Sequence, residues 1–252
     1  MLFMESFTAG FLIIGNEILS GRTIEKNLPV LTHMLNARGW RLAEVRVVPD
    51  VEAEIVAALN ALRSRYAQVF TSGGIGPTHD DITTDSVAAA FELPVIEHAD
   101  AVAILAEFYQ ARDLSFTNSR RRMTRTPVGA EVLTSDFPGA PAYRIDNVVV
   151  CAGVPSIFNL MATAAVAMLP LGVVRQSQAL SVRCGESVFA DYLSQVSAAF
   201  ADVEIGSYPR EENNAYVCQV VFTASIAERR NAAQQMFCDY LLSAKLPFEE
   251  LP

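Results

Sequence analysis

Apolar runs alternate with segments of helical periodicity through the first part of the chain, and this alternation constrains the fold most. Residues 10–14, 41–48 and 68–71 are apolar or alternating runs typical of strands. Between them we predict one helix that Asn27 caps and Gly39 ends, and a second over residues 51–63. The order β-α-β-α-β predicts an α/β fold, in which a parallel sheet carries helices on its faces.

The carboxyl ends of parallel strands lie at one edge of a sheet, where ligands of α/β proteins bind. Residues 15–21 follow the first predicted strand, and residues 72–81 follow the third. We therefore expect these two segments to lie on one rim.

A stretch without any charged residue, 147–174, is long enough to raise the question of a membrane span, which needs ~20 continuous apolar residues. Gly153, Pro155, Pro170 and Gly172 interrupt it. It therefore reads better as a buried strand at 147–151 and a helix at 156–168. Since no export signal precedes residue 11 either, we expect a cytoplasmic protein that does not enter a membrane.

The rest of the chain reads as two further parts. Helices are predicted at 83–91, 99–112 and 117–125, with short strands near Val132 and Tyr143. After a boundary near Gln176, residues 176–252 read β-α-β-β-α, a small α+β domain of the split βαβ type. The predicted domains are thus 1–175 and 176–252. The four cysteines lie 33, 34 and 20 residues apart without a CxxC pair, which indicates reduced thiols.

The charge argues against nucleic acid as a partner. The net charge is -9, from 19 basic and 28 acidic residues, whereas binding through phosphates needs a basic face. The GxxG within residues 73–76 follows a strand instead of joining two helices, which disfavours RNA binding of the KH type.

The most informative segment is TSGGIGPTHDDITTD at residues 71–85. Glycines after a strand let the backbone approach a ligand and turn its amides toward one point, as in loops that hold phosphates. The helix that follows adds positive potential at its N-terminus. His79 lies inside this loop and is a candidate to orient a phosphate.

Asp80, Asp81 and Asp85 crowd the same place, although carboxylates repel the anion that the amides attract. A divalent metal resolves this conflict, because carboxylates hold Mg²⁺ or a similar ion and the ion bridges to phosphate oxygens. We predict all three as metal ligands, and Asp80 and Asp81 as catalytic. The alternative is that these residues only cap the helix and that the glycines form a tight turn.

A second segment, IGNEILSG at residues 14–21, leaves the first strand on the same rim. Glu17 is a candidate for a metal or hydroxyl contact there, and Asn16 for a hydrogen bond to a ligand. The alternative is a loop whose polar residues satisfy its own backbone.

These two segments together resemble the molybdopterin-binding domain of the molybdenum-cofactor biosynthesis type, in particular its branch in the CinA (competence/damage-inducible protein A) family. Asn118 with Arg120 to Arg122, the PVGA run at 127–130 and AGVPS at 152–156 resemble later landmarks of that family. The resemblance covers about residues 8–170, and the remaining part is similar to the small domain that follows in CinA-like proteins.

The resemblance implies a three-layer α/β domain with a mostly parallel sheet and, for CinA-like members, metal-dependent hydrolysis of nucleotide diphosphates such as ADP-ribose or FAD. We expect Mg²⁺, Mn²⁺ or Co²⁺ as cofactor, a nucleotide or molybdopterin as small-molecule ligand, and a homo-oligomer. The ligand-binding positions that it implies are Gly15, Asn16, Glu17, Ser72, Gly73, Gly74, Gly76, Pro77, Thr78, Asn118 and Gly153.

Two alternatives to hydrolysis stay open. The same rim can accept molybdopterin or a nucleotide without cleaving it, or the acidic loop is vestigial in a scaffold. Arg120, Arg121, Arg122 and Arg125 form the one basic cluster of the sequence. One or two of them are candidates to reach the ligand, and otherwise they form a solvated helix face.

Overall fold

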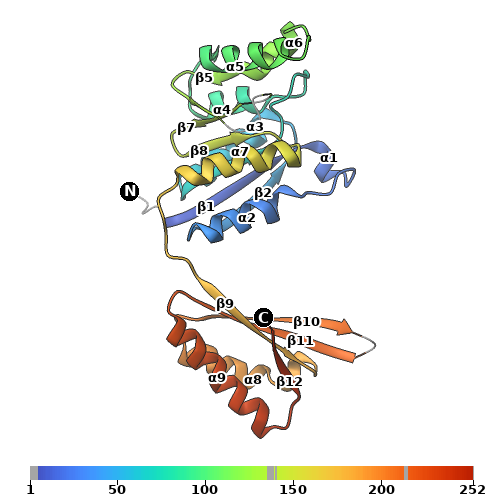
Figure 1. Ribbon diagram of the computed structural model, residues 1–252, viewed down its shortest axis with the longest axis vertical. Coiled ribbons are helices and arrows are strands. Elements are labelled where there is room, and N and C mark those ends of the chain that lie inside the picture. Colours follow the sequence, from blue (N-terminus) through green and yellow to red (C-terminus); the bar gives the residue numbers. More distant parts are fainter. Residues whose placement is uncertain (1–4, 135–138, 140, 213–214, 252) are drawn as a thin grey trace. The chain divides into compact units, whose positions relative to one another are not determined.

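The computed structural model describes residues 5–134, 139, 141–212 and 215–251. The chain divides into two compact units, residues 1–172 and 173–252 (Figure 1). Each unit has a hydrophobic core of its own. The boundary that the sequence placed near Gln176 falls at the first residue of the first strand of the second unit.

A six-stranded sheet forms the centre of the first unit, in the order β2-β1-β3-β8-β7-β6. β1, β2, β3 and β8 run parallel to one another, and β7 and β6 run antiparallel to them. The mostly parallel sheet is therefore confirmed. The strands are β1 (Glu5–Ile14), β2 (Arg41–Val48), β3 (Tyr66–Ser72), β6 (Glu131–Leu133), β7 (Ala142–Ile145) and β8 (Val148–Cys151).

Helices cover both faces of this sheet, which gives the three predicted layers (Figure 1). α2 (Asn27–Ala37) and α7 (Pro155–Met168) pack on one face, around Leu31, Leu35 and Phe158. α3 (Glu52–Arg63) and α4 (Thr83–Ala90) pack on the other, around Leu59 and Val87.

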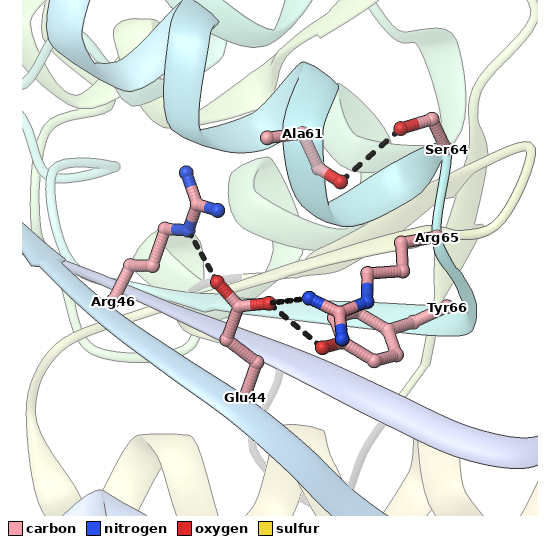
Figure 2. Close-up of polar contacts among 6 residues, drawn as sticks. All are labelled: Glu44, Arg46, Ala61, Ser64, Arg65 and Tyr66. Atoms are coloured by element: carbon pink, nitrogen blue, oxygen red, sulfur yellow. Dashed lines mark hydrogen bonds and ion pairs between the residues drawn. The ribbon is translucent and has the colours of Figure 1, made fainter.

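A glycine in the middle of β1 lets one side chain cross that strand. A Cβ at Gly10 would lie 3.0 Å from Cδ2 of Tyr66, so the tyrosine ring lies against the bare backbone there. Across β1, the Tyr66 hydroxyl donates to Glu44 of β2 at 2.7 Å, and Arg46 and Arg65 donate to the same carboxylate at 2.7 and 3.2 Å (Figure 2). The cluster ties β2 to the start of β3.

A smaller layer extends the first unit beyond α4. β4 (Val95–Glu97) pairs antiparallel with β5 (Arg125–Pro127), next to α5 (Ala99–Gln110) and the short α6 (Asn118–Arg121). The predicted helix over 117–125 is wrong in its second half, since residues 122–124 form a 3₁₀ turn and Arg125 begins β5. Pro127 disfavours the helical conformation at Thr126, and pairing with β4 supplies the alternative.

The second unit has a four-stranded antiparallel sheet in the order β10-β11-β9-β12. Its β-α-β-β-α-β order leaves β9 and β10 on opposite sides of β11, which is the split βαβ arrangement that the sequence predicted. β12 was not predicted, because only four residues form it. The elements are β9 (Gln176–Val182), α8 (Ala190–Ala199), β10 (Glu204–Glu212), β11 (Ala215–Ala224), α9 (Ala227–Ser243) and β12 (Phe248–Leu251).

The charge-free stretch forms β8 and α7, as predicted. Within the described ranges, no helix combines the length and the apolar character needed to cross a membrane. The four cysteines are free thiols, and burial raises the pKa of Cys151 to about 12.

Candidate functional site

The four parallel strands end at one edge of the sheet, and the predicted rim residues lie there. β1, β2, β3 and β8 end at Ile14, Val48, Ser72 and Cys151. The loop after β3 contains Gly73, Gly74, Gly76, Pro77, Thr78, Asp80 and Asp81, and the turn after β8 contains Gly153.

The glycine loop turns sharply because its first two residues adopt conformations that favour glycine. Gly73 has φ 106° and Gly74 has φ 66°. A Cβ at Gly73 would lie 2.2 Å from the carbonyl oxygen of Ile14, and one at Gly74 would lie 2.2 Å from Oγ1 of Thr83. Thr83 holds the loop against α4, since its hydroxyl donates to the Gly73 carbonyl at 2.8 Å and its amide donates to the Gly74 carbonyl at 2.9 Å.

Asp81 closes the second half of the loop. Its Oδ2 accepts from the amide of Thr78 at 2.8 Å and from the Thr78 hydroxyl at 2.5 Å. A Cβ at Gly76 would lie 2.7 Å from the same oxygen, so this glycine leaves room for the carboxylate. Asp81 thus closes the loop, but it does not cap α4, because the N-cap residue of that helix is Ile82 and no side-chain hydrogen bond from a described residue caps it.

The other two acidic residues of the motif have separate surroundings. Asp85, on α4, makes an ion pair with both terminal nitrogens of Arg125. Asp80 is exposed, and the Thr78 hydroxyl and its own backbone amide lower the pKa of its carboxyl. His79 is fully exposed beside it, with Nδ1 3.9 Å from the Asp80 carboxylate.

The structure does not bring Asp80, Asp81 and Asp85 together as one set of metal ligands. Among the described residues, no three His, Cys, Asp or Glu side chains are grouped so that they could hold a metal ion. The physical reason is that Arg125 neutralises Asp85 and that Thr78 occupies an oxygen of Asp81. The donor set therefore does not fit the predicted three-carboxylate metal site.

The first rim segment is helical where the sequence predicted a loop. Asn16 begins the short α1 (Asn16–Leu19), and the side chains of Asn16 and Glu17 are exposed. The amide of Gly15 donates to the Val48 carbonyl at 3.2 Å, and that of Asn16 donates to the Asp50 carboxylate at 2.8 Å. Asp50 was not singled out in the sequence, although it follows β2 on the same edge.

Asn27 lies on the same rim and has a different role from the predicted helix cap. It was predicted to cap α2, but Glu25 does so, because its two oxygens accept from the amides of Asn27 and Leu28 at 2.7 and 2.8 Å. Asn27 itself is 4% exposed, and its Nδ2 donates at 2.9 Å both to the Ser72 hydroxyl and to the Gly153 carbonyl. Its spacing of four from the buried Leu31 was the signal that it faces the core.

A cavity of about 60 Å³ opens beside Asn27. Glu17, Ser72, Gly73 and Gly153 line it, so four of the predicted ligand-binding residues meet at this point. Oδ1 of Asn27 is buried and has no hydrogen-bond partner among the described residues. The remaining walls are Ile13, Ile14, Ile18, Thr23, Ile24, Glu25, Lys26 and Pro155.

Among the described residues of the basic cluster, Arg122 is the one with a hydrogen bond to the glycine loop. Arg120 lies over the Tyr109 ring, Arg121 pairs with Glu97, and Arg125 pairs with Asp85. Arg122 instead donates to the backbone carbonyl of Asp81 at 3.4 Å. Asn118 begins α6 and is exposed, and no side-chain hydrogen bond joins it to the glycine loop within the described part of the chain.

A parallel sheet of three layers, with a glycine loop and a cavity at the carboxyl ends of its strands, defines an α/β ligand-binding domain. The chain belongs to the family described as "Probable molybdopterin binding domain", whose match covers residues 10–171. Residues 175–249 match a second family, described as "FAD synthase, middle domain".

Relatives extend the similarity beyond the first unit. A protein of Aeropyrum pernix is 32% identical over 217 residues, which cover 82% of this chain and 81% of the relative. One of Archaeoglobus fulgidus is 30% identical over 198 residues, covering 78% and 83%. Among solved structures, the CinA protein of unknown function from Thermoplasma acidophilum is 29% identical, with a TM-score of 0.55, over 60% of this chain and 91% of that one. The CinA-like resemblance is therefore confirmed.

Proposed function

We propose that the rim binds the phosphate-bearing part of a nucleotide or pterin ligand. The observation that carries this proposal is that three successive backbone amides have no hydrogen-bond acceptor among the described residues. Those of Gly74, Ile75 and Gly76 donate no hydrogen bond to any described residue, while Thr83 and Asp81 hold the loop around them in place. Successive backbone amides that are free to donate can bind an anion.

The neighbouring cavity can accommodate an organic group of the same ligand. Ile18, Ile24 and Pro155 supply apolar walls, and the Asn27 and Glu17 side chains supply acceptors for N–H groups. Binding sites commonly combine such walls with a few fixed polar groups. A ring that carries N–H donors, as pterins and nucleobases do, suits this combination.

The family assignments point in the same direction. The description of the first family names molybdopterin, and that of the second names an enzyme of flavin nucleotide synthesis. Both names involve a heterocycle joined to phosphate, which is the ligand chemistry proposed for the rim.

Titration calorimetry on one sample tests this proposal, with ADP-ribose, FAD, molybdopterin and inorganic pyrophosphate as probes. We expect at least one of the three heterocyclic ligands to bind more tightly than pyrophosphate, because the cavity adds contacts to those of the loop. Absence of binding for all four probes would contradict the proposal.

Hydrolysis of the bound diphosphate is the second candidate function, and Asp80 is the residue that favours it. Its carboxylate is exposed on the same loop, and its lowered pKa keeps it ionised, so it can orient an attacking water. A requirement for Mg²⁺, Mn²⁺ or Co²⁺ stays a prediction, and because the carboxylates do not form one ligand set, no step is assigned to the ion.

Product formation from ADP-ribose and FAD, measured with each of the three ions, tests hydrolysis. We expect Asp80→Asn to lower the rate while the variant still binds the substrate. If no ion supports turnover of either compound, hydrolysis is rejected and the binding proposal stands by itself.

A further inference from the structure

Among the described residues, Arg122 differs from Arg121 and Arg125 in having no carboxylate partner for its charge. Arg121 and Arg125 pair with carboxylates, and Arg120 lies over a ring and donates to the Ser115 carbonyl. The guanidinium of Arg122 makes one long contact, to the Asp81 carbonyl, and its Nε is buried without a hydrogen-bond partner among the described residues. A buried N–H without a hydrogen-bond partner is costly. An acceptor that reached this group would therefore be bound favourably.

The position of Arg122 near the N-terminus of α4 favours an anion as its hydrogen-bond partner. Asp81 lies two residues before Thr83, the first residue of α4, so the guanidinium sits at the end of that helix where the dipole is positive. A cation at this end is unfavourable unless negative charge lies close to it. A phosphate bound at the loop would supply that charge and accept hydrogen bonds from the guanidinium.

The nearby carboxylates do not take this role. Asp85 is neutralised by Arg125, and the Oδ2 atom of Asp81 accepts two hydrogen bonds from Thr78. Two of the three acids of the motif thus have partners within the protein, and the exposed Asp80 remains. The repulsion between the loop and an anionic ligand is therefore smaller than the sequence alone suggests.

Resting on the anion binding proposed above, we propose that Arg122 contacts the ligand's phosphate and that this binding needs no divalent metal. A guanidinium suits a phosphate because its planar set of donors matches two oxygens at once. Arg122 therefore acts as the specificity residue that selects a phosphate over a neutral group.

The experiment measures the dissociation constants of ADP-ribose and inorganic pyrophosphate in the presence of EDTA, for the full chain and for three variants. Arg122→Gln removes the charge, and we expect binding about ten- to a hundredfold weaker, as for the loss of a charged hydrogen bond. Arg122→Lys keeps the charge without the planar donors and should lie in between. Arg121→Gln makes the same change one residue away, where the partner is Glu97, and should bind as the parent does.

The outcomes separate this inference from the proposed function. If the parent binds and Arg122→Gln binds equally well, or if the parent binds only when Mg²⁺ is added, the inference is overturned while the binding proposal survives. If the parent binds neither probe under any condition, both fail. Circular dichroism tests whether each variant is folded. If Arg122→Gln does not fold, the dissociation constant of Arg122→Lys is compared with that of the parent instead.

Discussion

Gly74 combines a left-handed backbone with close contact, and the two effects can be separated. Its φ is 66°, and a Cβ there would lie 2.2 Å from Thr83 Oγ1. Gly129 has a similar φ of 84°, and a Cβ there would meet no atom of the described residues within 4 Å. We expect Gly129→Ala to lower the free energy of unfolding by about 1 kcal/mol, the cost of the conformation alone.

Gly74→Ala should cost more than that, roughly 2–4 kcal/mol, because the clash with Thr83 adds to the strained conformation. Urea unfolding of both variants gives the comparison. Equal losses for the two variants would show that the loop moves aside, and that its tight packing on α4 is not needed for stability.

Glu44 makes stability depend on pH. The hydrogen bond from Tyr66, followed by that from Arg46, lowers the pKa of its carboxyl below the ordinary 4.5 (Figure 2). Since the folded-state pKa is the lower one, the carboxylate stabilises the fold fully above about pH 4.5, and this contribution is lost as the pH falls through the folded-state pKa.

We therefore expect Glu44→Gln to be less stable than the parent at pH 7, with a difference that shrinks as the pH falls below 4.5. Urea unfolding from pH 7 to pH 3 measures it. Tyr66→Phe removes the largest cause of the lowered pKa and should weaken the pH dependence without abolishing it. A difference between parent and Glu44→Gln that stays constant over this range would contradict the assignment.

At the scale of the elements, Asn27 joins the start of α2 to the ends of β3 and β8. Its side-chain amide donates to the Ser72 hydroxyl and to the Gly153 carbonyl, and Asn27 itself is 4% exposed. Asn27→Ala leaves these acceptors without their donor, so we expect a loss of roughly 1–3 kcal/mol in the free energy of unfolding. Thermal unfolding measures this loss. Asn36→Ala, at the exposed end of the same helix, is the control and should cost less than Asn27→Ala.

At the scale of the whole molecule, the two units should fold independently. The core of the second unit, built around residues such as Val220, Phe222 and Phe237, shares no member with the cores of the first. We expect the fragment 173–252 to fold by itself and to unfold in one cooperative transition, which circular dichroism of the isolated fragment can show. A fragment without cooperative unfolding would contradict this. The homo-oligomer stays a prediction, and light scattering on the full chain can test it.

The sequence predicted most elements of the first unit because their patterns are local. The strand at residues 41–48 and the start of α4 at Thr83 agree with the structure, since apolar alternation and turn residues determine them. Short elements were missed for the opposite reason. β4 and β12 have only three and four residues, and pairing with distant strands, not local pattern, makes them strands.

The sequence by itself determined the α/β class, the split βαβ unit and the position of the glycine loop. These features depend on residues close together in the chain, through strand and helix periodicity and through glycines at turns. Only the tertiary structure decided which charges remain without partners. Arg125 reaches Asp85 from 40 positions away, and Asn27 reaches Gly153 across 126. Such contacts depend on how the layers pack. For this reason the three acids of the motif, which suggested a metal site, have separate surroundings: Asp81 closes the loop, Asp85 forms an ion pair and Asp80 is exposed.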